Sequence, residues 1–230
     1  MSEGLATEPH YGDGILRIIS RNDSQRIGIL LRHSVKDKSN AEGDEAGLSQ
    51  LGFAEARRFG RLLPKNRNLC LSYSPSPRCV ETATEIMRGF AEGKSGSVSD
   101  KGAEEFHASF RFFSRHEAKM DSYKKSVGPK VFLREWLDST LREDVMEPAA
   151  KVQRFLTNYF HNELEQIDRF TLRIWVSHDF SIMMMRELLF GAKFEREPWI
   201  SYLDGLILTN DSNKTLYATW NGRSAPVPEL

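Results

Sequence analysis

Four short apolar runs along the chain predict β-strands. Each run is rich in residues that favour strands and stops at a polar or turn residue. A fifth run follows the turn-like stretch DSNK, and we expect it to form a hairpin with the run before it. The predicted strands are 26–33, 69–75, 172–179, 205–210 and, closing the hairpin, 215–220.

Between these runs, apolar residues recur on one face at helical spacing, which predicts amphipathic helices. Pro148 stands at a favourable first-turn position, and Gly191 is expected to cap the end of a helix. Strands that alternate with helices predict an α/β fold of three layers, in which helices cover both faces of a mostly parallel central sheet. The predicted helices are 53–63, 80–87, 152–160 and 181–190.

Residues 92–130 interrupt this alternation. The segment opens with EGKSGSVSDKG and closes with SVGPK, which are both typical of loops. Within it, Phe106, Phe110 and Phe113 fall at helical spacing. We therefore expect a partly helical insertion that caps a pocket, inside a single domain spanning residues 1–230.

Composition narrows the class of protein. Hydrophobic residues make up 40% of the 230 positions and charged residues 28%, as in an ordinary soluble globular protein. Lysine plus arginine equals aspartate plus glutamate at 32 each, so no overall field favours nucleic acid or a membrane surface as a partner. The N-terminus carries no targeting pattern, and we expect a cytoplasmic protein. The two cysteines are not at zinc-ligand spacing, so no metal site is expected.

Three predicted strands end in residues suited to binding an anion. The first strand ends at Arg32 and His33, the second leads through SPSP to Arg78, and the third ends at His178 and Asp179. Ligands of open α/β sheets bind beyond the carboxyl ends of the strands, so we expect these side chains to converge there. Guanidinium groups fork onto phosphate oxygens, which makes phosphate the expected ligand.

The same stretches, in this order, resemble the histidine phosphatase superfamily, whose members have the phosphoglycerate mutase-like fold. They are LLRHSV with LSQLGFAEARRFGRLL after it, then SYSPSPRCVETATEI, and then WVSHDFS. The resemblance implies that His33 is the nucleophile that becomes phosphorylated and that Arg32, Arg78 and His178 bind the phosphoryl group. Neutral imidazole is a good nucleophile near pH 7, and fixed arginines can stabilise the charge that a metal ion stabilises elsewhere. Neither a metal nor another cofactor is therefore expected.

Two carboxylates compete as the acid that protonates the leaving group. Asp179 directly follows His178, which resembles the acid phosphatase and phytase branch, whereas Glu135 resembles the glutamate of the mutase branch. Both also have ordinary structural alternatives, because Asp179 could cap the next helix and Glu135 could be an exposed charge beside Arg134. We favour Glu135 slightly, since the other motifs resemble the mutase branch in length.

The loop after His33 departs from the family pattern. Ser34 stands where a glycine is usual, and Ser39 and Asn40 stand where an asparagine is often found. We name Ser34, Lys36 and Asn40 as candidate contacts to the substrate, although a solvated charged loop is the simpler alternative for Lys36.

The function expected from these residues is a metal-independent phosphatase that acts through a phosphohistidine. Its substrate would be a small-molecule phosphate ester or a phosphoprotein. A phosphoglycerate mutase-type phosphotransferase is the enzymatic alternative, because it would use the same pocket and return the phosphoryl group to a bound product. A non-catalytic phospholigand-binding protein is a third alternative, which the presence of His33 disfavours.

Overall fold

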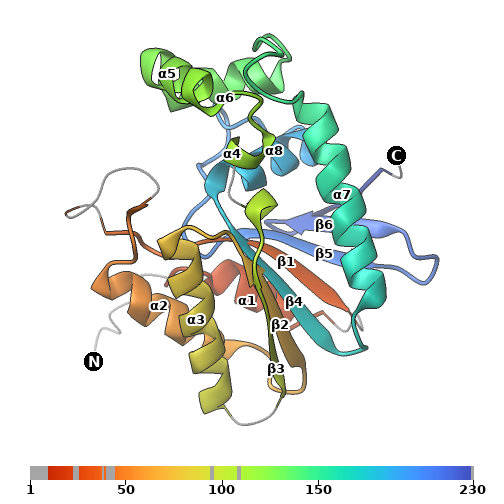
Figure 1. Ribbon diagram of the computed structural model, residues 1–230. Helices are drawn as coiled ribbons and strands as arrows, with labels where there is room; N and C mark the ends of the chain where they lie inside the picture. The colour runs from red at the N-terminus through yellow and green to blue at the C-terminus, as the bar shows by residue number, and fades with distance from the viewer. Residues whose placement is uncertain are drawn as a thin grey trace, which may run out of the picture.

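Seven strands form one sheet in the order β3-β2-β4-β1-β5-β6-β7 (Figure 1). The computed structural model describes residues 10–22, 26–37, 39, 45–93, 96–107 and 110–228. The strands are β1 (Ile27–Arg32), β2 (Asn68–Tyr73), β3 (Val98–Ala103), β4 (Thr171–Ser177), β5 (Gly205–Asn210), β6 (Leu216–Trp220) and β7 (Arg223–Pro226).

Half of the sheet is parallel. Strands β3, β2, β4 and β1 run in the same direction, whereas β5, β6 and β7 are added in antiparallel pairs. The register aligns Arg32 with Ser177 and Tyr73 with both Val176 and Ala103. The carboxyl ends of the four parallel strands therefore meet at one edge, and the predicted hairpin of β5 and β6 is confirmed.

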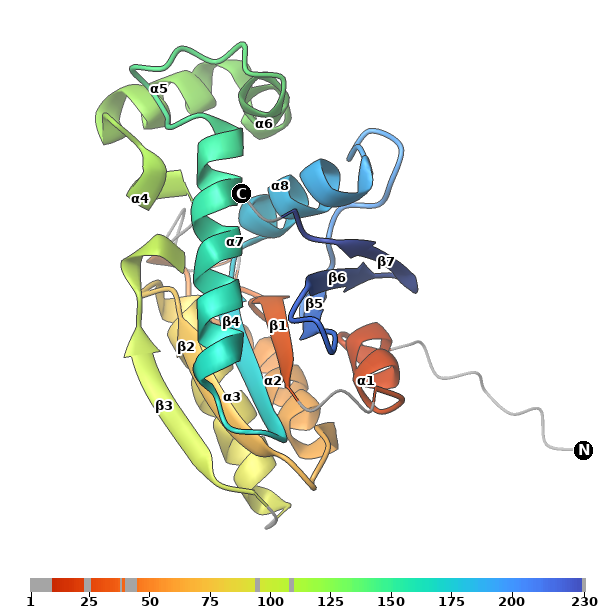
Figure 2. The same cartoon turned by 90° about the vertical axis from the view of Figure 1, so that its right-hand side faces the viewer.

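Helices cover both faces of the sheet. Along β1, Ile29 and Leu31 pack into one buried cluster and Leu30 packs into a second. Along β4, Ile174 belongs to the first cluster and Trp175 to the second. The first cluster lies under α1 (Asp13–Ile19), α2 (Gln50–Leu62) and α3 (Pro77–Glu92), and the second under α7 (Ala149–Gln166) and α8 (Asp179–Phe190). Figure 2 shows α7 crossing one face while α2 and α3 lie behind the sheet. The three-layer prediction is confirmed.

The segment 92–130, expected to be an insertion, begins inside the main fold. Val98–Ala103 forms strand β3, which pairs in parallel with β2 at the edge of the sheet. Its sequence, VSDKGA, lacks the apolar pattern of the other strands because most of its side chains are exposed. Within residues 92–130, the expected helices therefore follow β3, which ends at Ala103.

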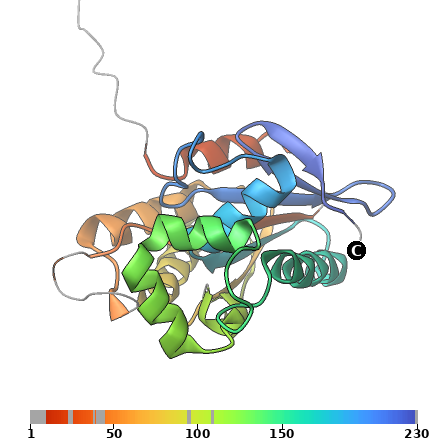
Figure 3. The same cartoon turned by 90° about the horizontal axis from the view of Figure 1, so that it is seen from above.

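A small helical cap follows β3 at the end of the sheet where β3 finishes. It comprises a 3-10 turn (Glu105–His107), α4 (Phe110–Phe113), α5 (Glu117–Val127) and α6 (Pro129–Leu137). Seen from above in Figure 3, the green helices lie over this end of the molecule. Phe132, Leu133 and Trp136 of α6 are buried in the same cluster as α8, and Arg134 donates to Glu187 of α8 at 2.6 Å. The cap is therefore fixed to the body rather than separate from it.

Candidate active site

His33 is the first residue beyond β1, and it is buried, with 3% of its surface exposed. Its Nδ1 lies 2.7 Å from the carbonyl oxygen of Ser34. Because a carbonyl oxygen only accepts, Nδ1 carries the ring proton and the lone pair remains on Nε2. Burial lowers the pKa of His33 to about 3; the bond to Ser34 opposes this, and the positive charges of Arg78 and Arg32 add to it. His33 is thus a neutral imidazole with a nucleophilic Nε2 at pH 7.

His178 and Arg78 form a second buried pair beside it. Nη2 of Arg78 donates to Nδ1 of His178 at 3.1 Å, and Nε2 of His178 lies 3.0 Å from Oγ of Ser74. A guanidinium only donates, so in neutral His178 the proton is on Nε2 and faces Ser74. The rings of His33 and His178 have their centroids 5.5 Å apart. The structure therefore brings together the two histidines predicted at different strand ends.

Arg32 is held on three sides at the same edge. Its Nη2 lies 2.9 Å from Oδ2 of Asp179, its Nη1 donates to the carbonyl of Ile200 at 2.5 Å, and its guanidinium carbon lies 4.4 Å from the ring centre of Tyr202. Within the described part of the chain, its buried Nε has no hydrogen-bond acceptor. A buried donor without an acceptor favours an anionic ligand at this point.

The loop after His33 is tied to two helices. The backbone nitrogen of Ser34 donates to Oγ1 of Thr82 at 3.0 Å, and its hydroxyl donates to the carbonyl of Gly52 at 2.8 Å. The backbone nitrogen and the hydroxyl of Ser34 therefore hold the loop of His33 in place. The contacts of Ser34 and Lys36 with substrate stay predictions, and Asn40 lies outside the described residues.

The two carboxylates proposed as the acid lie in different surroundings. Asp179 opens α8, and its Oδ2 accepts from Arg32 and from Nε1 of Trp199, both at 2.9 Å. Glu135 belongs to the cap, where its Oε2 accepts from the hydroxyl of Tyr123 at 2.7 Å. Asp179 is therefore bonded directly to a residue adjoining His33, and Glu135 joins α5 to α6.

Sequence reasoning missed a further pair of carboxylates, because it missed β3. Glu104 follows β3 directly and its backbone nitrogen donates to the carbonyl of Tyr73 at 2.8 Å, so it lies at the same edge as the histidines. Its carboxylate accepts from the hydroxyl of Tyr159 at 3.0 Å. Glu105, next in the chain, is exposed. The signal that could have found them is a strand end followed by two acidic residues.

His107, in the turn after β3, is another buried histidine at this edge. It is 1% exposed, its carbonyl accepts from the hydroxyl of Ser177 at 2.9 Å, and its Nε2 lies 3.3 Å from Oγ of Ser72. Ser177 immediately precedes His178. The turn after β3 is therefore fastened to the strand that presents the second histidine.

Comparisons with known proteins agree with this architecture. No model of a protein family matches the chain, and no curated protein matches its sequence. Among solved structures, Bacillus stearothermophilus YhfR matches with a TM-score of 0.60 at 16% identity, over 85% of this chain and 96% of that one. Phosphoglycerate mutase from Bacillus anthracis matches with a TM-score of 0.56 at 16% identity, over 90% and 94% of the two chains.

A mycobacterial glucosyl-3-phosphoglycerate phosphatase matches with a TM-score of 0.55 at 16% identity, over 81% of this chain and 91% of that one. Identities this low establish the fold alone. The fold that the sequence motifs predicted is confirmed.

Proposed function

We propose that this chain, which has the phosphoglycerate mutase-like fold of the histidine phosphatase superfamily, is a phosphatase that forms a phosphohistidine at His33. One observation carries the proposal: His33, buried and with its Nδ1 proton held by Ser34, lies beside a second histidine and within the influence of the charges of Arg78 and Arg32. Such an arrangement is suited to a phosphoryl group, whose negative oxygens require several fixed donors.

The reaction has two steps. In the first, Arg32, Arg78 and His178 hold the phosphoryl oxygens while Nε2 of His33 attacks phosphorus and the bond to the leaving oxygen breaks. An acid supplies the proton that the alkoxide needs, which releases the alcohol. In the second step, the carboxylate left by that acid takes a proton from water, the water oxygen attacks phosphorus, and the bond from His33 breaks. Inorganic phosphate leaves and the acid is regenerated.

Among the carboxylates, we propose Asp179 as the acid in preference to Glu135. Asp179 shares Arg32 with the expected phosphate site, whereas the hydrogen bond of the Glu135 carboxylate is made within the cap. In the resting state Oδ2 of Asp179 accepts from Arg32 and Trp199, so a bound phosphate would compete for Arg32 and bring its own negative charge next to the carboxylate. A neighbouring negative charge favours the protonated form that an acid requires. Glu105 is the second candidate, because it is exposed and opens the 3-10 turn just after β3.

A mutase remains the enzymatic alternative, since one of the structures of similar fold is a phosphoglycerate mutase. It would use the same nucleophile and return the phosphoryl group to a bound product. The phosphatase of similar fold acts, by its name, on glucosyl-3-phosphoglycerate. We therefore propose a small-molecule phosphate ester as the substrate class, with a phosphoprotein as the alternative and a non-catalytic phospholigand-binding role as the third hypothesis.

The experiment uses p-nitrophenyl phosphate and a panel of sugar phosphates, with and without a chelator of divalent metals. We expect stoichiometric release of inorganic phosphate and alcohol, unchanged by the chelator. Rapid acid-free quenching followed by mass spectrometry should show one phosphoryl group on His33, and His33→Ala should abolish both. His116→Ala, at an exposed histidine of the cap, is the matched control. A wild-type enzyme that turns over without phosphorylation of His33 would refute the covalent mechanism, and transfer without free phosphate would identify a mutase.

A further inference from the structure

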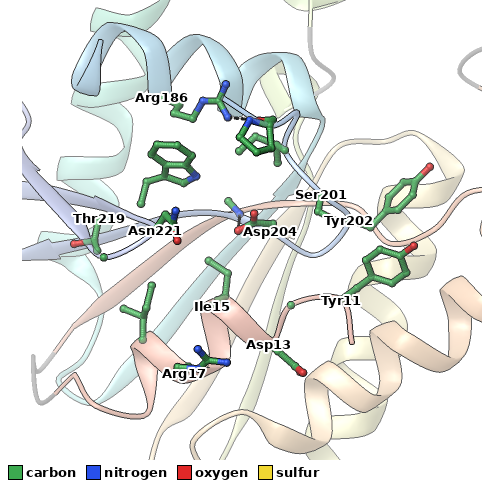
Figure 4. A pocket seen from close by; sticks show the side chains of 18 of the residues that line it. Tyr11, Asp13, Ile15, Arg17, Arg186, Ser201, Tyr202, Asp204, Thr219 and Asn221 are labelled. Carbon is green, nitrogen blue, oxygen red and sulfur yellow. Dashed lines mark hydrogen bonds between the residues drawn. The ribbon is translucent and has the colours of Figure 1, made fainter. Parts of the chain in front are cut away.

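A large pocket, whose lining does not include His33 or His178, lies between α1, the segment that leads into β5, and the turn between β6 and β7. Its volume is about 1170 Å³. Figure 4 shows Arg186 of α8 on one side of it, Ile15 and Arg17 of α1 on the other, and Asp204 between them. This space is ample for an organic molecule larger than free phosphate.

Arg186 is the unusual residue of this pocket. Its side chain is 0% exposed, and its Nη1 donates to the carbonyl of Pro198 at 2.7 Å. Its guanidinium carbon lies 4.9 Å from the ring centre of Trp220, which also lines the pocket. Nε and Nη2 are both buried, and neither has a hydrogen-bond acceptor among the described residues. These two adjacent donors of the guanidinium fork are covered in the free protein, so a ligand would reach them by displacing part of the segment that lines the pocket.

The acidic groups that face Arg186 are engaged elsewhere. Burial lowers the pKa of Arg186, and Glu197, Glu187 and Asp204 oppose that shift. Glu187 accepts two hydrogen bonds from Arg134, Glu197 lies 3.7 Å from Arg223, and Asp204 accepts from the backbone of Gly205. Burial also raises the pKa of Asp204, which favours its neutral form. No formal ion pair therefore completes the Arg186 fork within the described residues.

We propose that this pocket binds a small organic anion. Its carboxylate or phosphate oxygens would accept hydrogen bonds from Nε and Nη2 of Arg186. The guanidinium fork matches two oxygens of either group. The body of the ligand would lie against the ring of Trp220 and the apolar side chain of Ile15. The exposed Arg17 of α1, at the rim, adds a second positive charge for such a molecule.

One wall of the pocket is shared with the catalytic edge. Along the segment 198–204, Pro198 contacts Arg186, Trp199 donates to Asp179, and the carbonyl of Ile200 accepts from Arg32. Tyr202 lines the pocket with one part of its surface and lies against Arg32 with another. A ligand that moves this segment would alter the position of Arg32, so the bound anion is expected to change the KM of the proposed reaction.

The binding experiment uses calorimetry with citrate and AMP as organic probes and inorganic phosphate as the simple anion. All proteins carry His33→Ala, so that AMP is not turned over and the result does not depend on the proposed activity. Arg186→Leu removes the fork, Arg186→Lys keeps the charge, and Thr219→Trp fills the pocket from β6. Arg142→Leu, at an exposed arginine of a distant loop, and Arg78→Leu, in the catalytic cluster, are the controls.

We expect citrate or AMP to bind, and Arg186→Leu and Thr219→Trp to weaken binding by about 10-fold or more, as for the loss of a charged hydrogen bond. Arg186→Lys should weaken it less, and Arg142→Leu should bind as the parent does. Arg78→Leu should lose only the binding of AMP or phosphate at the catalytic cluster, and the binding that depends on Arg186 should persist. If Arg186→Leu does not fold, Thr219→Trp alone decides. Failure of both organic probes to bind, equal binding in the filled pocket, or loss of all binding in Arg78→Leu would each overturn the proposal.

Discussion

Nη2 of Arg78 lies 3.1 Å from Nδ1 of His178, and this contact joins the second and third strand-end motifs. Because the guanidinium donates, it selects the ring nitrogen of His178 that carries the proton. The arginine therefore orients the second histidine besides supplying charge. Arg78 is itself buried at the first turn of α3, where Pro77 precedes it in the helix.

Arg78→Lys should lower kcat/KM by about 10²-fold to 10³-fold, the effect of removing one fixed donor from an anionic transition state. Lysine keeps the charge and loses the planar fork that donates to His178 and that we propose binds the phosphate. Steady-state kinetics with p-nitrophenyl phosphate measure the loss. Arg88→Lys, on the same helix but with a 62% exposed side chain, should retain wild-type kinetics. Comparable activity in the two variants would show that the contact is unimportant.

The ionisation of His33 should not limit activity in the physiological range. Burial lowers its pKa to about 3, so the nucleophilic neutral form persists as the pH falls from 7 toward that value. Nuclear magnetic resonance of the imidazole ring of His33 should show no titration between about pH 5 and 8, where an ordinary histidine ionises. The ring signal of His33 is assigned as the one that disappears from the spectrum of the His33→Ala variant. A midpoint near the ordinary value of 6.5 would contradict the burial argument.

His107 should make the fold sensitive to acid. Burial, reinforced by the charge of Arg173, lowers the pKa of His107 from 6.5 to about 3. Between these values the unfolded chain binds a proton that the folded chain does not. The contribution of neutral His107 to the free energy of unfolding is therefore fully present above about pH 6.5 and is lost as the pH falls toward 3. His107→Gln should therefore show a smaller decrease in unfolding free energy from pH 7 to 4.5.

Urea denaturation at the two pH values tests this prediction. Replacing the exposed His116 by glutamine gives the control, which should follow the wild-type pH dependence. An identical pH dependence in His107→Gln and wild type would mean that His107 does not contribute.

The proton donor can be identified by varying the leaving group. Asp179→Asn should lower kcat on an alkyl phosphate by about 10²-fold or more, with a much smaller effect on p-nitrophenyl phosphate, whose leaving group hardly needs a proton. A defect caused only by loss of the bond to Arg32 would affect both substrates equally. Glu135→Gln and Glu105→Gln are the parallel variants. If either one lowers kcat on the alkyl phosphate much more than on p-nitrophenyl phosphate, and Asp179→Asn does not, that glutamate is the acid instead of Asp179.

The loop of His33 depends on close contact with the start of α2. A methyl group at Gly52 would lie 2.1 Å from the carbonyl oxygen of Val35, so Gly52→Ala must displace this loop. Ser34→Ala removes the bond to the Gly52 carbonyl and should lower the free energy of unfolding by about 1 kcal/mol. Gly52→Ala should be the more damaging change for both stability and activity.

Gly14→Ala is the matched control, because nothing lies within 4 Å of the added carbon and alanine favours the helix. Thermal unfolding and kcat/KM measured on the three variants give the comparison. If Gly52→Ala behaves as Gly14→Ala does, the close contact with Val35 is not maintained in solution.

The sequence predicted the parts of the site that follow buried strands. The proximity of His33 and His178 could be predicted because apolar runs end just before them and parallel strands bring such ends together. Tyr202 and Thr82 were missed, since their contacts with Arg32 and Ser34 join residues far apart in the chain. No local sequence pattern predicts contacts of this kind.

Strand β3 was missed for a related reason. A strand at the edge of a sheet needs no apolar face, and its pairing with β2 is supplied by backbone groups. The carboxylates that follow it were missed with it. Motif length favours Glu135 as the acid, a role that stays a prediction. Its hydrogen bond within the cap could not be predicted, because that bond depends on how α5 meets α6.

The two outer strands of the sheet also affect how the protein behaves at high concentration. β3 carries Asp100 and Lys101 and has a break in its register against β2, and β7 is short and ends at Pro226, which has no N–H to donate. Charges, irregular pairing and proline all oppose the addition of a strand from another molecule. Neither margin of the sheet is therefore a good template for aggregation, although the buried strands between them would be if the protein unfolded.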